Sequence, residues 1–215
     1  MLDTTLITAL QQQLSQPLPG PTAQAKMASG SRKKFPVIPA NAKKACVLCL
    51  LYPKNEEWYI VLMQRVSTNP NDQHSGQMSF PGGKLETSDE TYAHAALRET
   101  EEEVGVPATD IDLLGQMTPL YIPVSNFHVF PFVGVLDYTP TFQPELQEVK
   151  EVVEAPLSLL LDDTTRQITD LTIRDYTIRD VHYFDVFGKV VWGATAMMLS
   201  EFVEIVRGAR VDLPS

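Results

Sequence analysis

Cysteine and histidine are scarce in this chain, which has two cysteines and four histidines in 215 residues. A zinc site needs several such ligands at short spacings, and the histidines at 74, 94, 128 and 182 are scattered. The cysteines, Cys46 and Cys49, lie in one apolar run that predicts a strand, on which residues three apart point to opposite faces. We therefore expect two buried core thiols and no zinc site.

Long apolar runs are absent as well. The longest candidate, residues 190–198, is interrupted by Trp192 and Gly193 and falls short of the roughly 20 residues that a membrane-spanning helix needs. The first residues, MLDTTLITALQQQ, lack the basic start of a secretory signal and the arginines of a transit peptide. These absences predict a cytoplasmic protein that has no membrane partner.

Positive charge is scarce and unevenly placed. The net charge is −10, yet residues 1–50 carry six Lys or Arg and one acid, Asp3. An acidic body argues against nucleic acid as a partner, because nucleic-acid binding depends on basic side chains that neutralise phosphates. It suits a small anionic substrate if metal ions bridge the two. The basic run Arg32-Lys33-Lys34 then either keeps an extended arm soluble or reaches over the cleft to a substrate phosphate.

Apolar periodicity divides the chain into an N-terminal part, residues 1–35, and one domain, residues 36–215. The N-terminal part begins with an amphipathic helix over 6–16, which ends before Pro17, and an extended arm follows to residue 44. Strands are expected over 45–52 and 59–64, paired with each other, and over 78–83, 111–116, 127–136, 172–178 and 182–187. Helical segments are expected over 157–161 and 194–206, and the echo TIRDYTIRD at 172–180 is interpreted as a local hairpin. Strands mixed with two substantial helices predict an α/β sandwich.

The most informative stretch is RETEEEVG, residues 98–105, which has four glutamates in five positions. Like charges three and four residues apart on a helix repel by roughly 0.2–0.5 kcal/mol per pair, and Glu99 meets both Glu102 and Glu103 in this way. The cluster also lies at the C-terminal end of its helix, where the helix dipole disfavours anions. An acidic run alone is usually a solvated surface, but two penalties at one place suggest a bound cation.

The limits and faces of this helix can be predicted too. Thr87 and Glu90 have the spacing of a capping box at its start, and Gly105 and Pro107 mark its end. At about 100° per residue, the spaced glutamates share one face. The opposite face carries small or apolar side chains, namely Ala93, Leu97, Thr100 and Val104. The helix is therefore expected to pack by that face and to present its acids to a cleft.

Carboxylates on one side of a helix suit Mg²⁺ or Mn²⁺, which prefer oxygen ligands and usually share them with substrate phosphates. Gly82-Gly83, just upstream, lets the backbone pass close to this site, so the Gly82 carbonyl can join the ligands. Arg98 keeps its charge and can orient a neighbouring glutamate or contact a phosphate.

This order of residues resembles the Nudix box, in which a glycine and a short loop precede Arg-Glu-x-x-Glu-Glu-x-Gly on a helix. Here Gly83 to Arg98 spans fifteen positions, one more than in the general box. Either Asp89 or Glu90 then takes the place of the first glutamate of the box, and Glu90 keeps the helical spacing to Arg98. Thr100 stands where an aliphatic residue is usual.

The chain further resembles the coenzyme A pyrophosphatase-like branch of the Nudix hydrolase superfamily, in which the longer box is normal. The similarity extends to HSGQMSFPGG at 74–83, PLYIPVSNFHVFPFVG at 119–134 and WGATAMML at 192–199. It implies a Nudix-type α/β/α sandwich with a mixed β-sheet, in a single domain that follows the N-terminal helix and arm. It also implies diphosphate hydrolysis, with 4'-phosphopantetheine and adenosine 3',5'-bisphosphate as the products from coenzyme A.

The same resemblance implies roles for individual residues. Mg²⁺ or Mn²⁺ ions are expected on Gly82, through its carbonyl, and on Glu99, Glu102 and Glu103. The expected catalytic residues are Arg98, Glu99, Glu102, Glu103 and Glu148, and the general base is Glu102, Glu103 or Glu148. The expected substrate-binding residues are Arg65, His74, Gln77, Ser79, Gly83, Ser125 and Asn126. His74 and His128 can equally be structural, and Ser125-Asn126 can instead cap a turn.

Two alternatives stay open. The substrate can be ADP-ribose, NADH or another nucleoside diphosphate derivative. The chain can also be a catalytically silent nucleotide-binding regulatory domain on the same fold, although all three metal carboxylates are present. The resemblance is compatible with a homodimer that acts on a small-molecule diphosphate.

Overall fold

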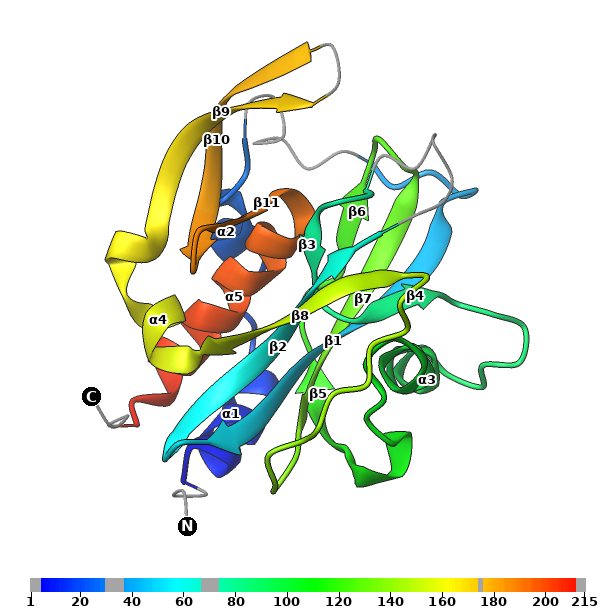
Figure 1. The fold of residues 1–215 in the computed structure, drawn as a ribbon, viewed down its shortest axis with the longest axis vertical. Helices are drawn as coiled ribbons and strands as arrows, with labels where there is room; N and C mark the ends of the chain where they lie inside the picture. Colours follow the sequence, from blue (N-terminus) through cyan, green and yellow to red (C-terminus); the bar gives the residue numbers. More distant parts are fainter. Residues whose placement is uncertain (1–4, 30–36, 67–73, 174–175, 212–215) are drawn as a thin grey trace.

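The centre of the molecule is a mixed β-sheet (Figure 1). The computed structural model describes residues 5–29, 37–66, 74–173 and 176–211, and eight strands of these residues form the sheet. The described strands are β1 (Lys43–Lys54), β2 (Glu57–Arg65), β3 (Met78–Ser79), β4 (Gly82–Lys84), β5 (Asp112–Gln116), β6 (Leu120–Ile122), β7 (Phe127–Val135) and β8 (Val149–Pro156). β1 runs parallel to β7 and antiparallel to β2 and β4. This pairing confirms the predicted mixed sheet and the predicted hairpin of its first two strands.

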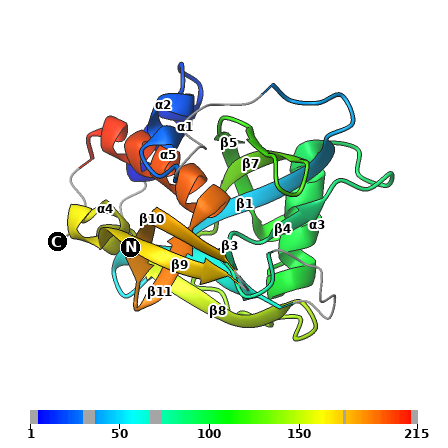
Figure 2. The same cartoon turned by 90° about the horizontal axis from the view of Figure 1, so that it is seen from above.

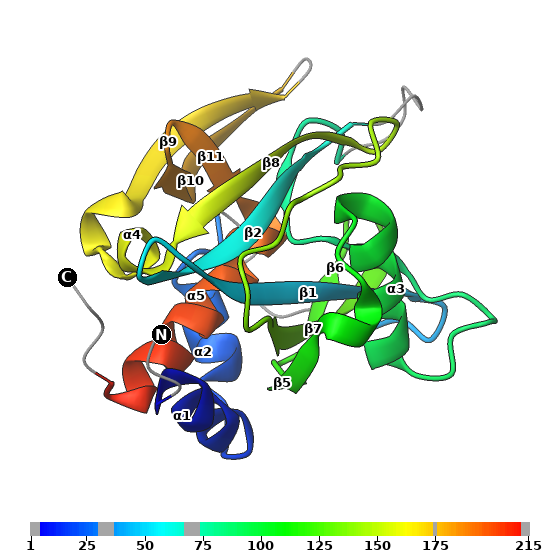
Figure 3. The same ribbon diagram turned by 60° about the horizontal axis from the view of Figure 1, so that its bottom comes forward.

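Helices cover both faces of the sheet, as Figures 1 and 2 show. One face carries α3 (Tyr92–Val104), and the other carries α1 (Thr5–Leu14), α2 (Gly20–Ala25) and α5 (Gly193–Ala209) (Figure 3). Each face buries its own apolar core. β1 separates the two cores because its side chains alternate, so that Leu48 and Leu50 point to the α3 side and Leu51 points to the α5 side. The α/β/α sandwich is confirmed.

The two cysteines fall on opposite faces of β1, as the sequence predicted. Cys46 belongs to the core under α3, Cys49 belongs to the core under α5, and both are free and fully buried. Burial is the main cause that raises the pKa of Cys46 to about 12, and the charges of Asp89 and Glu99 contribute to the rise. Both thiols therefore stay protonated at neutral pH and serve as core side chains.

A second, smaller sheet follows the main one in the chain. It contains β9 (Arg166–Ile173), β10 (Tyr176–Val186) and β11 (Lys189–Trp192) and comes after a short helix, α4 (Leu157–Leu161). The expected single strand over 172–178 is wrong, because Ile173 ends β9 and pairs antiparallel with Tyr176 at the start of β10. Thr172 and Thr177, which begin the two TIRD repeats, therefore pair across a hairpin, which confirms that interpretation.

The N-terminal segment is more helical than predicted. α1 matches the expected amphipathic helix, but residues 20–25 form α2 and not part of an extended arm. The reason is a tertiary contact with Glu201 of α5, which is fully buried. Its carboxylate accepts hydrogen bonds from the Gly20 N–H at 3.1 Å and from the Gln24 side chain at 2.8 Å. The basic run 32–34 lies outside the described residues.

The remaining predictions for the fold can be compared element by element. The strands expected over 111–116 and 127–136 and the helical segments expected over 157–161 and 194–206 are confirmed within a few residues as β5, β7, α4 and α5. In the part of the chain that the structure describes, no helix is both long enough and apolar enough to cross a membrane.

Candidate active site

The glycine pair is held against β1 at very short range. β4 pairs antiparallel with β1, which places Gly82 opposite Val47 and Gly83 opposite Cys46. Gly82 has φ +146°, and a Cβ at this position would overlap the Cys46 carbonyl oxygen. At Gly83 a Cβ would overlap the carboxylate of Glu99. The missing side chains therefore let the strand approach β1 and leave room for the Glu99 carboxylate beside it.

The ends of α3 partly differ from the prediction. Its N-cap is Thr91, whose side-chain oxygen accepts the His94 N–H at 3.0 Å, so the capping box expected from Thr87 and Glu90 is wrong. The C-terminal end is as predicted, because Gly105 adopts the left-handed conformation with φ 73° and donates its N–H to the Glu101 carbonyl. Such a cap lets the chain leave the helix directly after the glutamates.

Arg98 is fixed by Asp89, which the sequence offered as the alternative to Glu90. Its Nε and Nη2 atoms each lie 3.0 Å from an oxygen of Asp89, and the Asp89 side chain is fully shielded from solvent. The hydrogen bond from Arg98 is the main cause that lowers the pKa of Asp89. Glu90, which the spacing favoured as the partner, is exposed instead. That preference is corrected because residues 85–91 form a loop, where helical spacing does not apply.

Arg98 also holds two of the glutamates. Its guanidinium contacts Glu99 at 3.1 Å, Glu102 at 2.9 Å and the Lys84 carbonyl at 3.2 Å. These contacts, with those to Asp89, use several donors of a rigid fork at once. Arg98 therefore orients neighbouring carboxylates and ties the loop after β4 to the helix.

Glu103 is buried, which differs from the expected exposed acidic face. Its side chain is 2% exposed, whereas that of Glu102 is 59% exposed. One carboxylate oxygen accepts the Gly82 N–H at 2.7 Å, and the other lies 3.3 Å from Nη1 of Arg65. The pKa of Glu103 is raised to about 8, mainly by burial; the Gly82 N–H and Arg65 oppose this rise, and the charges of Glu99 and Glu148 add to it.

Glu148 lies close enough to act electrostatically on this cluster. It is exposed, and its charge raises the pKa of both Glu99 and Glu103. For Glu99 the first cause of the raised pKa is burial, which Arg98 opposes. The predicted catalytic residue from the loop before β8 is therefore brought to the helix that carries the other acids.

The carboxylates of the acidic cluster do not form a closed cation cage, although their chemistry suits a divalent cation. Within the described residues, no three His, Cys, Asp or Glu side chains are arranged as a ready cation cage. Glu102 points to Arg98, and Glu103 contacts Arg65 and Gly82. The donor set still fits a hard cation, because Glu148 repels both Glu99 and Glu103 and oxygen ligands suit Mg²⁺ or Mn²⁺. The space beside Gly83 also accommodates the carboxylate of Glu99.

The other predicted site residues divide into two groups. His74 and Gln77 contact each other at 3.2 Å, and their turn bonds to the backbone of Arg65, which brings them to the Glu103 side of the site. Ser79 lies on β3 opposite Met63 of β2. Ser125 and Asn126 occupy the turn between β6 and β7, where Asn126 contacts Asn41 and Tyr121 and not the acidic helix.

His128 lies on β7, and its ring centroid is 4.5 Å from that of Phe130. Burial and the charge of Lys44 lower its pKa. Phe130 in turn stacks on Tyr92 at the start of α3. This packing supports the structural interpretation of His128 over a substrate-binding one.

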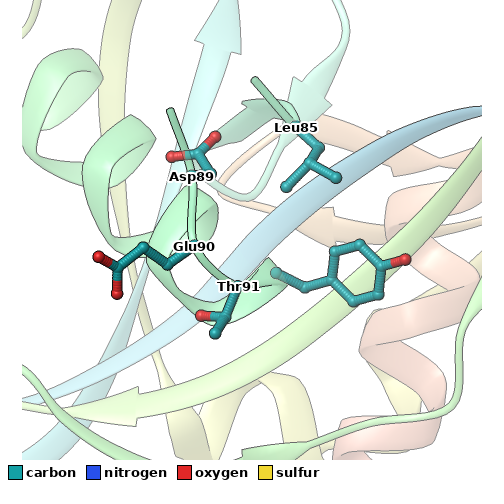
Figure 4. Close-up of a pocket in the computed structure, with 5 residues that line it drawn as sticks. Leu85, Asp89, Glu90 and Thr91 are labelled. Carbon is teal, nitrogen blue, oxygen red and sulfur yellow. The ribbon is translucent and has the colours of Figure 1, made fainter. Parts of the chain in front are cut away.

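A small pocket of about 360 Å³ lies at the N-terminal end of α3 (Figure 4). It is lined by Leu85, Asp89, Glu90, Thr91 and Tyr92. Asp89, one of the lining residues, is bound by Arg98, so the pocket borders the ion pair that holds Arg98 in place. The pocket lies at the other end of the helix from Glu102 and Glu103.

Comparison with known proteins supports the resemblance that the glycine pair and the acidic helix suggest. The family model described as NUDIX domain matches residues 42–175. The chain is 31% identical over 188 residues to "Nudix hydrolase 22, chloroplastic" of Arabidopsis thaliana, which covers 82% of this chain and 60% of that protein. It is 32% identical over 176 residues to "Uncharacterized Nudix hydrolase NudL" of Yersinia enterocolitica, which covers 78% of this chain and 83% of the relative.

A likeness in fold extends to solved structures. A Nudix hydrolase from M. Smegmatis, RenU, matches 81% of this chain and 91% of its own length, with a TM-score of 0.54 at 16% identity. At this identity the likeness concerns the fold alone. The chain spans less than two thirds of the length of the Arabidopsis relative and most of the length of the Yersinia relative.

Proposed function

Because the chain belongs to the Nudix hydrolase family, we propose that it is a divalent-cation-dependent diphosphatase that cleaves coenzyme A or a derivative of it. One observation carries the proposal. Glu148 of a separate loop lies near enough to Glu99 and Glu103 of one helix for its charge to raise their pKa, and the adjacent Gly83 leaves room for the Glu99 carboxylate. Such a cluster is costly unless cations offset it.

Each group has a part in the proposed reaction. Glu99, Glu102 and Glu103, with the Gly82 carbonyl, would hold Mg²⁺ or Mn²⁺ ions. When bound, such ions offset the charge of a diphosphate and lower the pKa of a water molecule. Arg98 orients Glu99 and Glu102 through the contacts described above.

Glu148 is the residue that we assign as the general base. Glu102 is held by Arg98, and the two oxygens of Glu103 have partners in Gly82 and Arg65. Glu148 is exposed and lies near enough to Glu99 and Glu103 to raise their pKa. A base must reach the attacking water while the other carboxylates hold the cations, and Glu148 fits that requirement.

The assignment of coenzyme A rests on the sequence stretches around the box. Gln77, Ser79 and His74 lie before the glycine pair in HSGQMSFPGG, and Ser125 and Asn126 lie in the turn of PLYIPVSNFHVFPFVG. We propose that these residues, with Gly83, contact the substrate beyond its diphosphate. The competing substrates are ADP-ribose, NADH and other nucleoside diphosphate derivatives.

A comparison of substrates tests this proposal. The protein is incubated with Mg²⁺ and, separately, with coenzyme A, an acyl-coenzyme A, ADP-ribose and NADH, and the products are identified by mass spectrometry. We expect 4'-phosphopantetheine and adenosine 3',5'-bisphosphate from coenzyme A, and no product when the cation is chelated. Faster turnover of ADP-ribose or NADH would keep the diphosphatase and reject the assigned substrate.

The support of Arg98 can be tested with two neighbouring substitutions. Asp89→Asn is expected to lower kcat by about 10–100-fold, as is typical when a residue that orients a ligand is lost. Glu90→Gln is the matched control, since Glu90 is exposed, and it should leave kcat unchanged. A larger loss of kcat in Glu90→Gln than in Asp89→Asn would contradict the assignment of Asp89 as the partner of Arg98.

Asp89→Asn is also expected to be less stable than the unmodified protein by an amount that depends on pH. The pKa of Asp89 is lowered in the folded protein, so its ion pair stabilises the fold above the ordinary Asp pKa of about 3.9. This stabilisation disappears as the pH falls through the lowered value. The melting temperature of Asp89→Asn should therefore be lower than that of the unmodified protein at pH 7. The difference between the two melting temperatures should shrink as the pH falls into the acid range. A difference that is constant with pH would contradict the assignment.

A further inference from the structure

Arg65 stands where three segments of the proposed site meet. It is the last residue of β2; its backbone N–H donates to the Gln77 carbonyl at 3.0 Å, and its own carbonyl accepts the Gly76 N–H at 2.8 Å. The next N–H, of Val66, donates to the Glu148 carbonyl at 2.8 Å. The backbone of Arg65 is thus fixed both to the turn that carries His74 and Gln77 and to the loop that carries Glu148.

The side chain of Arg65 connects this junction to the helix. Its Nη1 lies 3.3 Å from one oxygen of Glu103, and the other oxygen accepts the Gly82 N–H at 2.7 Å. The Glu103 side chain is 2% exposed and that of Arg65 is 27% exposed. Two donors from two different strands therefore reach the two oxygens of one buried carboxylate.

Two donors fix the orientation of the Glu103 carboxylate, which one donor alone would leave free. The last torsion of a glutamate side chain is broad, so a carboxylate held at one oxygen can still turn. A second donor from β2 removes that freedom, and its charge offsets a carboxylate that would otherwise be buried without a cationic partner. Arg65 therefore decides which way the Glu103 oxygens face.

We propose that Arg65 is a positioning residue that acts through Glu103, and not a residue that binds the substrate. The inference rests on the proposed function, because it concerns how one of the proposed ligands is oriented. It replaces the substrate-binding role that the sequence suggested for Arg65. It also explains why the end of β2, the 74–77 turn and the loop before β8 must fold together for the site to form.

The first arm of the test separates positioning from substrate binding. Arg65→Gln is expected to lower kcat by about 10–100-fold with little change in KM, because the substrate does not touch Arg65. Arg65→Lys should recover part of kcat, since a single ammonium donor can replace the single contact to Glu103. A raised KM with an unchanged kcat would overturn the proposal in favour of direct substrate binding.

The second arm uses the protein without cations. Urea unfolding midpoints are measured in the presence of a chelator for the unmodified protein, Arg65→Gln, Glu103→Gln and the double variant. We expect the two substitutions to be non-additive, because each removes the same contact. If the changes in midpoint are additive, Arg65 and Glu103 do not interact and the proposal is overturned. If the changes are non-additive but Arg65→Gln leaves kcat unchanged, the Arg65–Glu103 contact stabilises the fold only, and the proposal is also overturned.

Lys54→Gln is the control for both arms. Lys54 lies on β1 and pairs with Glu154 of β8 at 2.8 Å, so this variant removes a different ion pair that holds two elements of the fold together. It should leave kcat and KM unchanged. If the unmodified protein hydrolyses no diphosphate with any cation, the proposed function fails, whereas normal turnover without an effect of Arg65→Gln rejects only this inference.

Discussion

Replacing Glu103 by glutamine is expected to lower kcat/KM by more than about 100-fold, because loss of a residue that only orients a metal ligand already costs about 10–100-fold. Glutamine has nearly the same shape and can still accept the Gly82 N–H, but it carries no charge for a cation or for Arg65. Steady-state rates with Mg²⁺ measure the effect, and circular dichroism checks that the variant is folded.

Glu101→Gln is the matched control for this substitution. Glu101 lies on the same helix but is exposed, and its side chain accepts the Ala108 N–H at 3.0 Å, away from the acidic cluster. It should keep kcat/KM near that of the unmodified protein. Equal losses from the two variants would mean that total helix charge matters and that Glu103 has no special place.

Replacing Glu148 by glutamine is expected to lower kcat by about 10²–10⁴-fold, the usual contribution of a general base. Cation affinity should fall less than in Glu103→Gln, because Glu148 is assigned to the water and acts on the metal site only through its charge. Rates at saturating Mg²⁺ measure the first effect, and Mn²⁺ titration measures the second.

Glu145→Gln serves as the comparison for the base. Glu145 belongs to the same loop and is exposed, and one of its side-chain oxygens accepts the Gln147 N–H at 3.1 Å. We expect it to retain activity. A Glu148→Gln enzyme with full kcat would assign the base to Glu102 or Glu103 instead.

The local parts of the site could be predicted from the sequence. The glycine pair, the acidic helix and its end at Gly105 depend on short-range rules of backbone conformation and helix spacing. The choice between Asp89 and Glu90 could not, because it depends on how the loop folds. There the Asp89 carboxylate accepts the Glu86 N–H at 2.8 Å, which turns it towards Arg98. The sequence shows only that two acids, Asp89 and Glu90, are adjacent, and it does not indicate which of them binds Arg98.

The burial of Glu103 shows a second limit. At about 100° per residue, Glu103 lies between Glu99 and Thr100 around the helix, at the border of the acidic face. Thr100 is fully buried, so a small displacement of the packed face covers Glu103 as well. Which residues cover it, Gly82 and Arg65, depends on strands that are distant in sequence.

The longer apolar strands of the sheet were predicted, whereas the mixed strand β8 was missed. β8, with the sequence VKEVVEAP, carries charges that hide its strand character. It becomes a strand because β2 offers a long antiparallel partner, with Leu62 opposite Val153. Such tertiary support overrides local preference in strands more than in helices.

Binding of Mn²⁺, followed by electron paramagnetic resonance without substrate, tests the central claim most directly. The claim is that the glutamates of α3 hold the catalytic cation. It predicts that the unmodified protein and Glu101→Gln bind Mn²⁺ with the same affinity and that Glu103→Gln binds it at least about 10-fold more weakly. Equal affinity of all three proteins, or cation-dependent hydrolysis that survives in Glu103→Gln, would contradict the account.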